Sequence, residues 1–225
     1  KCINIKIDLG DKIALLGKSG SGKTSLIKIA NGTIRPTFGN ILYKGEIITK
    51  LSRKKKSQIA TFWQDLRLIE ELTVIQNVNC GALARHNLIW AIANLLDVVN
   101  LNQSYDCLEA SFLSKRLSRR NIRELSSGQR TRVALARLLN QHSKLILADE
   151  PFSNLEPILG EKILDTLLTQ CHGKKTEIAN TCLISLHRPD LVEKFTRVIG
   201  IKQGEIKIDS SVNEIDKNDI LNLYS

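Results

Sequence analysis

The pattern of apolar and polar positions in the first part of the chain predicts strands around one short helix. Apolar residues at positions 3, 5 and 7 alternate with polar ones, which is typical of a half-buried strand. Residues 13–16 are all apolar and predict a fully buried strand. A helix is expected over 24–30, because Asn31-Gly32 supplies a stop signal directly after it.

The periodicity changes after a hairpin expected over 41–48 and a strand expected over 59–63. From about residue 66 to 125 no strong strand pattern is present, and apolar residues recur at helical spacing. This stretch therefore predicts an inserted helical subdomain. Its apolar positions at helical spacing are Val74, Ile75, Val78, Leu88, Ile89, Ile92, Leu95 and Leu96.

Strands and helices alternate again in the last part of the chain. The expected elements are an amphipathic helix after Gln129, a strand over 145–148, a helix over 157–171, a strand over 182–186, a hairpin over 198–208 and a helix over 212–223. This alternation favours an α/β fold with a mostly parallel sheet, an N-terminal antiparallel part and the helical insertion.

Length and composition are those of one globular domain. The chain has 225 residues, of which 42% are apolar and 25% charged, and it has no apolar run of about 18 residues that could span a membrane. We expect one domain over 1–225, with 1–64 and 130–225 as its core and 65–129 as the helical subdomain. The five cysteines lack Cys-x-x-Cys spacing, so reduced thiols in a cytosolic protein are expected, and Cys171-His172 lacks further metal ligands.

The net charge of +10 favours an anionic partner, either nucleic acid or an anionic membrane surface, or else a solvated basic face. The densest basic run is Arg53-Lys54-Lys55-Lys56, and runs of this kind usually face solvent. Aromatic residues make up only 4% of the chain, which weakens a single-strand-binding function because stacking on bases needs aromatic rings.

A glycine-rich loop joins the first buried strand to the first helix. Its sequence, Gly17-Lys18-Ser19-Gly20-Ser21-Gly22-Lys23-Thr24, fits the Gly-x4-Gly-Lys-Thr pattern of phosphate-binding loops. Glycines let successive backbone N–H groups point at phosphate oxygens, and the start of the helix adds its positive end. Lys23 would neutralise the β- and γ-phosphates, and the Thr24 hydroxyl would hold Mg²⁺.

Four further polar side chains follow expected strands. Asp149 ends the apolar run over 145–148, where its carboxylate would meet Mg²⁺ or its waters, and Glu150 could polarise the attacking water. A helix-capping acidic pair is the alternative for these two residues. His187 follows the strand over 182–186, at the end that faces the ligand in a parallel sheet, and could bind the γ-phosphate. Gln64, at the start of the helical insertion, could reach Mg²⁺ or the attacking water.

Together these motifs resemble the ATP-binding cassette (ABC) ATPase family over essentially the whole chain. The loop from Gly17 to Thr24 resembles Walker A, Gln64 the Q-loop, Leu125-Ser126-Ser127-Gly128-Gln129 the signature motif, Leu145 to Asp149 Walker B, Glu150 the catalytic glutamate, Ser153-Asn154-Leu155-Glu156 the D-loop, and His187 the switch histidine. The resemblance implies a P-loop NTPase core.

The resemblance also implies a mechanism, in which two copies pair head to tail around ATP and Mg²⁺. Glu150, His187 and Lys23 would be catalytic, and Thr24, Gln64 and Asp149 would bind the metal. Nucleotide contacts are implied for Gly17, Lys18, Ser19, Gly20, Ser21, Gly22, Lys23, Thr24, Ser25 and Gln64 of one copy and for Ser126, Gly128 and Gln129 of the other.

Narrower likenesses favour importers, and among them the phosphonate-importer ATPases. They lie at residues 31–39, 72–78, 81–83, 186–191, 199–204 and 220–225. Leu186 stands where most importer ATPases carry Thr before the switch histidine. The resemblance implies a peripheral protein on the cytoplasmic face of the cell membrane, with integral membrane permease subunits as partners and a solute-binding protein acting indirectly. An importer of another solute, such as an amino acid, is the alternative.

The chain departs from the family pattern at three places. Ser127 replaces the first glycine of the signature, Glu156 replaces the D-loop aspartate, and no aromatic residue that could stack on adenine precedes Gly17.

Two other classes of protein were weighed. A soluble ABC-type ATPase acting on nucleic acid is supported by the charge of +10, but the insertion lacks coiled-coil heptads and zinc-ligand cysteines, so no nucleic acid is expected. A P-loop kinase would leave the signature and His187 unexplained.

Overall fold

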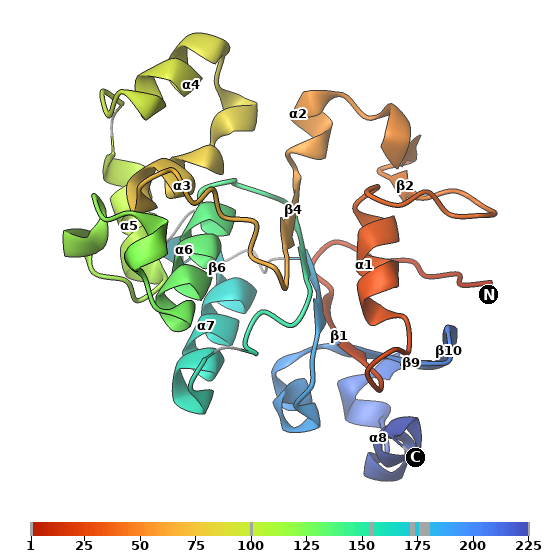
Figure 1. The fold of residues 1–225 in the computed structure, drawn as a ribbon. Coiled ribbons are helices and arrows are strands. Elements are labelled where there is room, and N and C mark those ends of the chain that lie inside the picture. Colours follow the sequence, from red (N-terminus) through yellow and green to blue (C-terminus); the bar gives the residue numbers. More distant parts are fainter. Residues whose placement is uncertain (1, 100, 154, 172–173, 176–180, 225) are drawn as a thin grey trace.

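The computed structural model of the protein describes residues 2–99, 101–153, 155–171, 174–175 and 181–224. A six-stranded sheet lies at its centre (Figure 1). In their order across the sheet, the strands are β10 (Glu205–Ser211), β9 (Arg197–Lys202), β1 (Lys12–Leu16), β8 (Thr181–Ser185), β5 (Leu145–Ala148) and β4 (Ile59–Phe62). Neighbouring strands from β9 to β4 are parallel, and β10 pairs antiparallel with β9. The mostly parallel sheet predicted from the sequence is therefore confirmed.

Both faces of the sheet are covered by helices. In β1, Ala14 and Leu16 pack into one apolar cluster while Ile13 and Leu15 pack into another, as alternation along a strand requires. Helix α1 (Lys23–Ala30) contributes to the cluster of Ile13. Helices α6 (Ser127–Leu139) and α7 (Pro157–Thr169) contribute to the other, and Figure 1 shows them on the opposite side from α1. The unbroken apolar strands of the sequence are explained by this burial on two faces.

The strand predicted at positions 3–7 is wrong. Residues 2–8 form no strand, although Ile5 and Ile7 pack, partly buried, against the cluster on the face of α1. Alternation places side chains, but a strand also needs a neighbouring backbone to bond. The short strands β2 (Leu42–Tyr43) and β3 (Glu46–Ile47) pair with each other instead. The antiparallel part near the N-terminus is therefore the predicted β2–β3 hairpin alone.

Between β4 and β5 the described residues form helices and turns, as the sequence predicts. The helices are α3 (Val74–Cys80), α4 (Leu88–Leu95), α5 (Asn102–Ala110) and α6, and the four-residue α2 (Arg53–Lys56) precedes β4. Thr73 caps α3 through a reciprocal hydrogen-bond pair with Gln76. Helices α3, α5 and α6 meet in an apolar interface that includes the fully buried Val78, Leu108 and Leu135. No helix of the described chain is both long and apolar enough to cross a membrane.

Three helices differ from the prediction by two or more residues at one end. Helix α6 begins at Ser127, three residues before the expected start, because Ser126 caps it. Helix α7 ends at Thr169, and the small hairpin of β6 (Gln170–Cys171) and β7 (Lys174–Lys175) follows; His172 lies outside the described residues. The single C-terminal helix expected over 212–223 is a 3-10 turn at Val212–Glu214 followed by α8 (Lys217–Tyr224).

Helices α3 and α6 approach each other closely at Gly81, where an added Cβ would lie 2.1 Å from the Arg137 carbonyl oxygen. Gly81→Ala must therefore push the two helices apart. We expect it to lower the free energy of unfolding by about 1–3 kcal/mol, measured by urea denaturation. Gly160→Ala in α7 is the control, since its Cβ would meet Phe152 at an ordinary 3.5 Å. Equal losses in both variants would contradict this account.

Candidate functional site

The predicted site residues lie at one edge of the sheet. Strands β1, β8, β5 and β4 are neighbours and parallel, so their carboxyl ends meet at the same edge. The glycine-rich loop follows β1, His187 follows β8, the pair Asp149 and Glu150 follows β5, and Gln64 follows β4. In open parallel sheets this edge is where ligands bind. The fold therefore gathers four segments that lie far apart in the sequence.

Two glycines set the path of the glycine-rich loop. Gly17 has a φ of 148°, and a Cβ there would lie 2.2 Å from the Ile201 carbonyl oxygen. Gly22 has a φ of 113° and directly precedes α1. The turn between β9 and β10 also holds the loop in place, because its Gly204 N–H donates to the Ser21 carbonyl at 2.9 Å. Only glycine at 17 allows this close approach of loop and β9.

The Lys23 side chain is buried within the loop, with 4% of the residue exposed. Its ammonium donates to the Gly17 carbonyl at 2.7 Å and to the Lys18 carbonyl at 3.2 Å. Burial lowers the pKa of Lys23, and the nearby Glu150 and Asp149 carboxylates partly offset this shift. The loop thus holds the Lys23 ammonium where water solvates it poorly. An anion that binds beside it would stabilise its charge.

The rest of the loop offers polar groups to a ligand. Lys18, Ser19 and Gly20 are exposed at its tip, and Thr24 and Ser25 lie on the first turn of α1. The buried Ser21 hydroxyl has no hydrogen-bond partner within the described structure. A buried hydroxyl without a partner is costly, and a phosphate oxygen would satisfy it.

A serine inside β8 organises the acidic pair. Ser185 is fully buried, and its hydroxyl donates to Asp149 Oδ1 at 2.9 Å. The Ser185 hydroxyl oxygen in turn accepts from the Glu150 N–H at 2.8 Å. Glu150 has a φ of 49°, a left-handed conformation that costs a non-glycine residue about 1–3 kcal/mol. The two hydrogen bonds of Ser185 therefore fix both acids of the pair.

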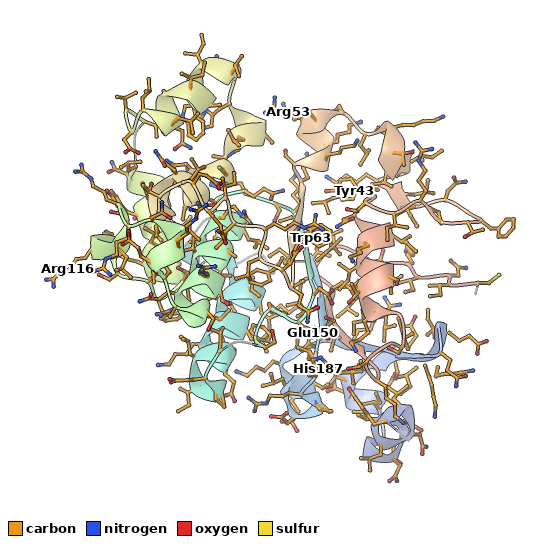
Figure 2. All side chains as sticks on the ribbon, viewed as in Figure 1. Tyr43, Arg53, Trp63, Arg116, Glu150 and His187 are labelled. Carbon is orange, nitrogen blue, oxygen red and sulfur yellow. The ribbon has the colours of Figure 1, made fainter. Side chains whose placement is uncertain are left out.

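The Glu150 carboxylate lies between two of the other predicted residues. His187 Nε2 is 2.6 Å from Glu150 Oε1, and Gln64 Nε2 donates to Glu150 Oε2 at 3.4 Å. Only 13% of the Glu150 side chain is exposed, against 47% for His187. Figure 2 labels Glu150 and His187 next to each other, in agreement with this contact. One carboxylate thus joins the ends of β4, β5 and β8.

The oxygen donors at this edge suit Mg²⁺. The described residues contain no group of three or more His, Cys, Asp and Glu that could hold a metal. Mg²⁺ needs only one or two carboxylates, with hydroxyl, phosphate and water oxygens completing its shell. Asp149, which is 2% exposed and keeps one carboxylate oxygen beyond its bond to Ser185, fits that role with the Thr24 hydroxyl and the Gln64 amide oxygen.

The predicted signature residues lie at the start of α6. The Ser126 hydroxyl accepts from the Gln129 N–H at 3.3 Å, and Gln129 Oε1 accepts from the Ser126 N–H at 3.0 Å. Gly128 is inside the first turn, and Ser126 and Ser127 are exposed. The positive end of α6 is thus presented to solvent, where an anion could bind it. Ser127 fits this exposed first turn without a clash.

The segment after Gln64 is tied to the other end of α6. Arg137 donates to the Leu66 carbonyl at 2.5 Å and to the Arg67 carbonyl at 2.6 Å. The Arg67 guanidinium lies 3.6 Å from the centre of the Trp63 ring. Burial lowers the pKa of Arg137, which nevertheless stays charged because arginine titrates far above neutral pH.

Two supporting residues were missed by the sequence analysis. Ser185 is the one polar residue of the strand expected over 182–186, and that irregularity was the available signal. Nothing in the sequence around Gly204 indicated its role, because its hydrogen bond to Ser21 joins residues that are far apart in the sequence. Of the D-loop motif, Asn154 lies outside the described residues, while Ser153 and Glu156 are exposed.

Comparisons with known proteins agree with this geometry. The ABC transporter family profile matches residues 1–153. The phosphonates import ATP-binding protein PhnC of Bacillus thuringiensis subsp. konkukian is 34% identical over 230 residues, covering 99% of this chain and 86% of that protein. PhnC of Fusobacterium nucleatum subsp. nucleatum is 33% identical, covering 100% of this chain and 91% of its own. A solved dimer of the ATP-binding cassette MJ0796, bound to ADP and Pi, matches with a TM-score of 0.81 at 26% identity, covering 96% of this chain and 91% of that one.

A glycine-rich loop between a parallel strand and a helix, with an acidic pair on a nearby strand, defines the class of P-loop nucleoside triphosphatases. The family match and the full-length relatives narrow this class. The chain belongs to the ABC transporter family, and it is an ABC-type ATPase that binds ATP.

Removing the Ser185 hydroxyl tests its role in holding the acidic pair. We expect Ser185→Ala to lower the free energy of unfolding by about 1–3 kcal/mol, because two buried polar groups lose their partner. The variant should also lose ATPase activity when assayed as the folded protein. Ser111→Ala is the matched control, since Ser111 is equally buried and donates to the Leu108 carbonyl away from the site. The idea fails if both variants keep full activity.

Proposed function

We propose that this chain is the ATP-hydrolysing subunit of an ABC importer for phosphonate or a related phosphorus oxyanion. The observation that carries the catalytic part is the Glu150 carboxylate, held between Gln64 and His187 beside the glycine-rich loop. A carboxylate with two polar neighbours, at the edge of the sheet where a nucleotide would bind, can position and polarise a water molecule. The names and full-length coverage of the relatives support the import part.

In this proposal each site residue at the carboxyl edge of the sheet has one role. Lys23 leaves its two carbonyl partners to neutralise the β- and γ-phosphates. Glu150 takes a proton from the attacking water, and His187 orients that water against the γ-phosphate. Mg²⁺, held by Thr24, Asp149 and Gln64, would supply charge neutralisation on the phosphate oxygens.

Two copies then work as a head-to-tail dimer. The exposed start of α6, with Ser126, Gly128 and Gln129, offers N–H groups and a positive helix end to the nucleotide of the second copy. The solved relative MJ0796 is a dimer, which supports this arrangement. Closure would move residues 65–129 as a helical subdomain against a core of 1–64 and 130–225.

Permease subunits would receive this motion at the cytoplasmic face of the cell membrane, and a solute-binding protein would act indirectly. An ATPase acting on nucleic acid remains the second candidate, and the net charge of +10 is the observation that favours it.

The catalytic role of Glu150 is tested by Glu150→Gln. We expect ATP hydrolysis to fall by at least about 100-fold, because the amide cannot accept the proton of the attacking water. ATP binding should persist, so that an ATP-bound dimer accumulates in size-exclusion chromatography. Glu193→Gln, an exposed glutamate outside the site, is the control and should hydrolyse ATP normally. Unchanged turnover in Glu150→Gln would remove Glu150 as the base.

The importer assignment is tested by affinity purification of the chain from solubilised membranes of its own host. We expect integral membrane subunits to co-purify, and ATPase activity of that complex to rise when a solute-binding protein loaded with a phosphonate is added. Stimulation of the isolated chain by DNA or RNA, with no membrane subunit recovered, would favour the second candidate instead.

A further inference from the structure

Helix α4 carries its apolar side on the outside of the protein. Leu88 is 75% exposed, Ile89 76%, Ile92 51% and Leu95 56%. At 3.6 residues per turn these positions fall within an arc of about 120° on one side of the helix. Leu96 and Val98, directly after the helix, are 68% and 71% exposed. The apolar side of a helix normally faces the core of a protein, whereas the apolar side of α4 faces solvent.

The inward side of α4 carries one polar residue, Asn94, beside the half-buried Trp90, Ala91 and Ala93, and Asn94 is held by hydrogen bonds. Asn94 is 2% exposed, accepts from Asn79 Nδ2 at 2.6 Å and donates to the Gln76 carbonyl at 3.3 Å. The buried Ser104 donates to the side-chain oxygen of Asn79, and Asn140 Nδ2 donates to Ser104 at 3.1 Å. Turning α4 to hide its apolar side would break this network and leave buried polar groups unpaired. The outward orientation is therefore built into the fold.

A cluster of cations lies beside α4. All four residues of α2, Arg53 to Lys56, are exposed. Arg53 donates to the Leu83 carbonyl at 2.7 Å, in the turn that leads to α4. Lys55 is paired with Glu46, and the exposed Asp97, between Leu96 and Val98, accepts a hydrogen bond from Gln76. Residues 83–96 contain Arg85 and no acid. Figure 1 shows α2 and α4 at the same end of the molecule, and Figure 2 shows Arg53 between them.

We propose that α2 and α4 together form a surface that binds the anionic lipid leaflet of a membrane. The apolar arc of α4 would enter the boundary between headgroups and acyl chains, and the cations of α2 would lie at the level of the lipid phosphates. An exposed apolar helix side flanked by more cations than acids has the chemistry of interfacial membrane binding. Glu150 and His187 lie well away from Arg53 (Figure 2), so binding through α2 and α4 leaves the ATPase site in water.

This inference goes beyond the proposed function, because it gives the ATPase a lipid contact that needs no permease. It also accounts for a basic run that the ATPase site does not use. Charge and apolar surface act together in such binding, so each contribution can be removed separately.

Vesicle sedimentation of the purified full-length chain tests the proposal. We expect the chain to bind vesicles of phosphatidylcholine with phosphatidylglycerol, to bind phosphatidylcholine alone weakly, and to dissociate at high salt. The double variant Leu88→Ser with Ile92→Ser should reduce the partition coefficient at least about tenfold. Lys54→Glu with Lys56→Glu should abolish the preference for anionic vesicles.

Matched variants on other surfaces are the controls. Ile158→Ser with Leu221→Ser changes side chains that are 73% and 65% exposed on α7 and α8. Lys144→Glu with Lys162→Glu repeats the charge change elsewhere. Basal ATPase activity, which should stay unchanged in every variant, shows that each one is folded and keeps this test separate from the ATPase proposal.

Three results would overturn the proposal. The wild-type chain could fail to bind either kind of vesicle, or the control variants could lose binding as much as the α2 and α4 variants. The α4 variant could also keep its vesicle binding but lose co-purification with membrane subunits. That last result would assign the apolar surface to a protein partner in place of lipid.

Discussion

The hydroxyl of Ser185 links strand β8 to the acidic pair that follows β5, and the position of the Glu150 carboxylate depends on it. It bonds the Asp149 carboxylate on one side and the Glu150 N–H on the other, at 2.9 and 2.8 Å. These bonds hold the backbone of Glu150 in a conformation that a non-glycine residue adopts only at a cost. The carboxylate then reaches both His187 and Gln64. A single buried oxygen in β8 thus sets the direction of an acid that follows β5.

The sequence predicted the parts of the fold that are set by local signals. Unbroken apolar runs marked β1, β5 and β8 because these strands are buried on both faces, and the glycine-rich loop marked the start of α1. The strand expected at positions 3–7 failed because pairing depends on a distant backbone, which no local pattern describes. For α4 the helix was predictable but its orientation was not. The direction of its apolar side depends on Asn79, Ser104 and Asn140, which come from three other elements.

The same distinction applies to the candidate site. Side chains that directly follow parallel strands could be assigned to one edge from the sequence, since the chain direction fixes where such strands end. Their contacts could not be assigned, because the meeting of Glu150 with Gln64 and His187 depends on strand order and on side-chain rotamers. Ser185 was overlooked because a serine within an apolar strand has no single chemical meaning until its neighbours are known.

Arg137 gives the ATPase a mechanical property. Its two hydrogen bonds attach the segment after Gln64 to α6, whose other end carries Ser126 and Gly128. The helix between these ends is about 15 Å long at 1.5 Å per residue, and it behaves as a stiff rod. A tilt of about 10° at the Arg137 end moves the other end by about 2.5 Å, close to the length of one hydrogen bond. A small displacement of the segment after Gln64 would therefore shift Ser126 and Gly128 far enough to make or break a hydrogen bond.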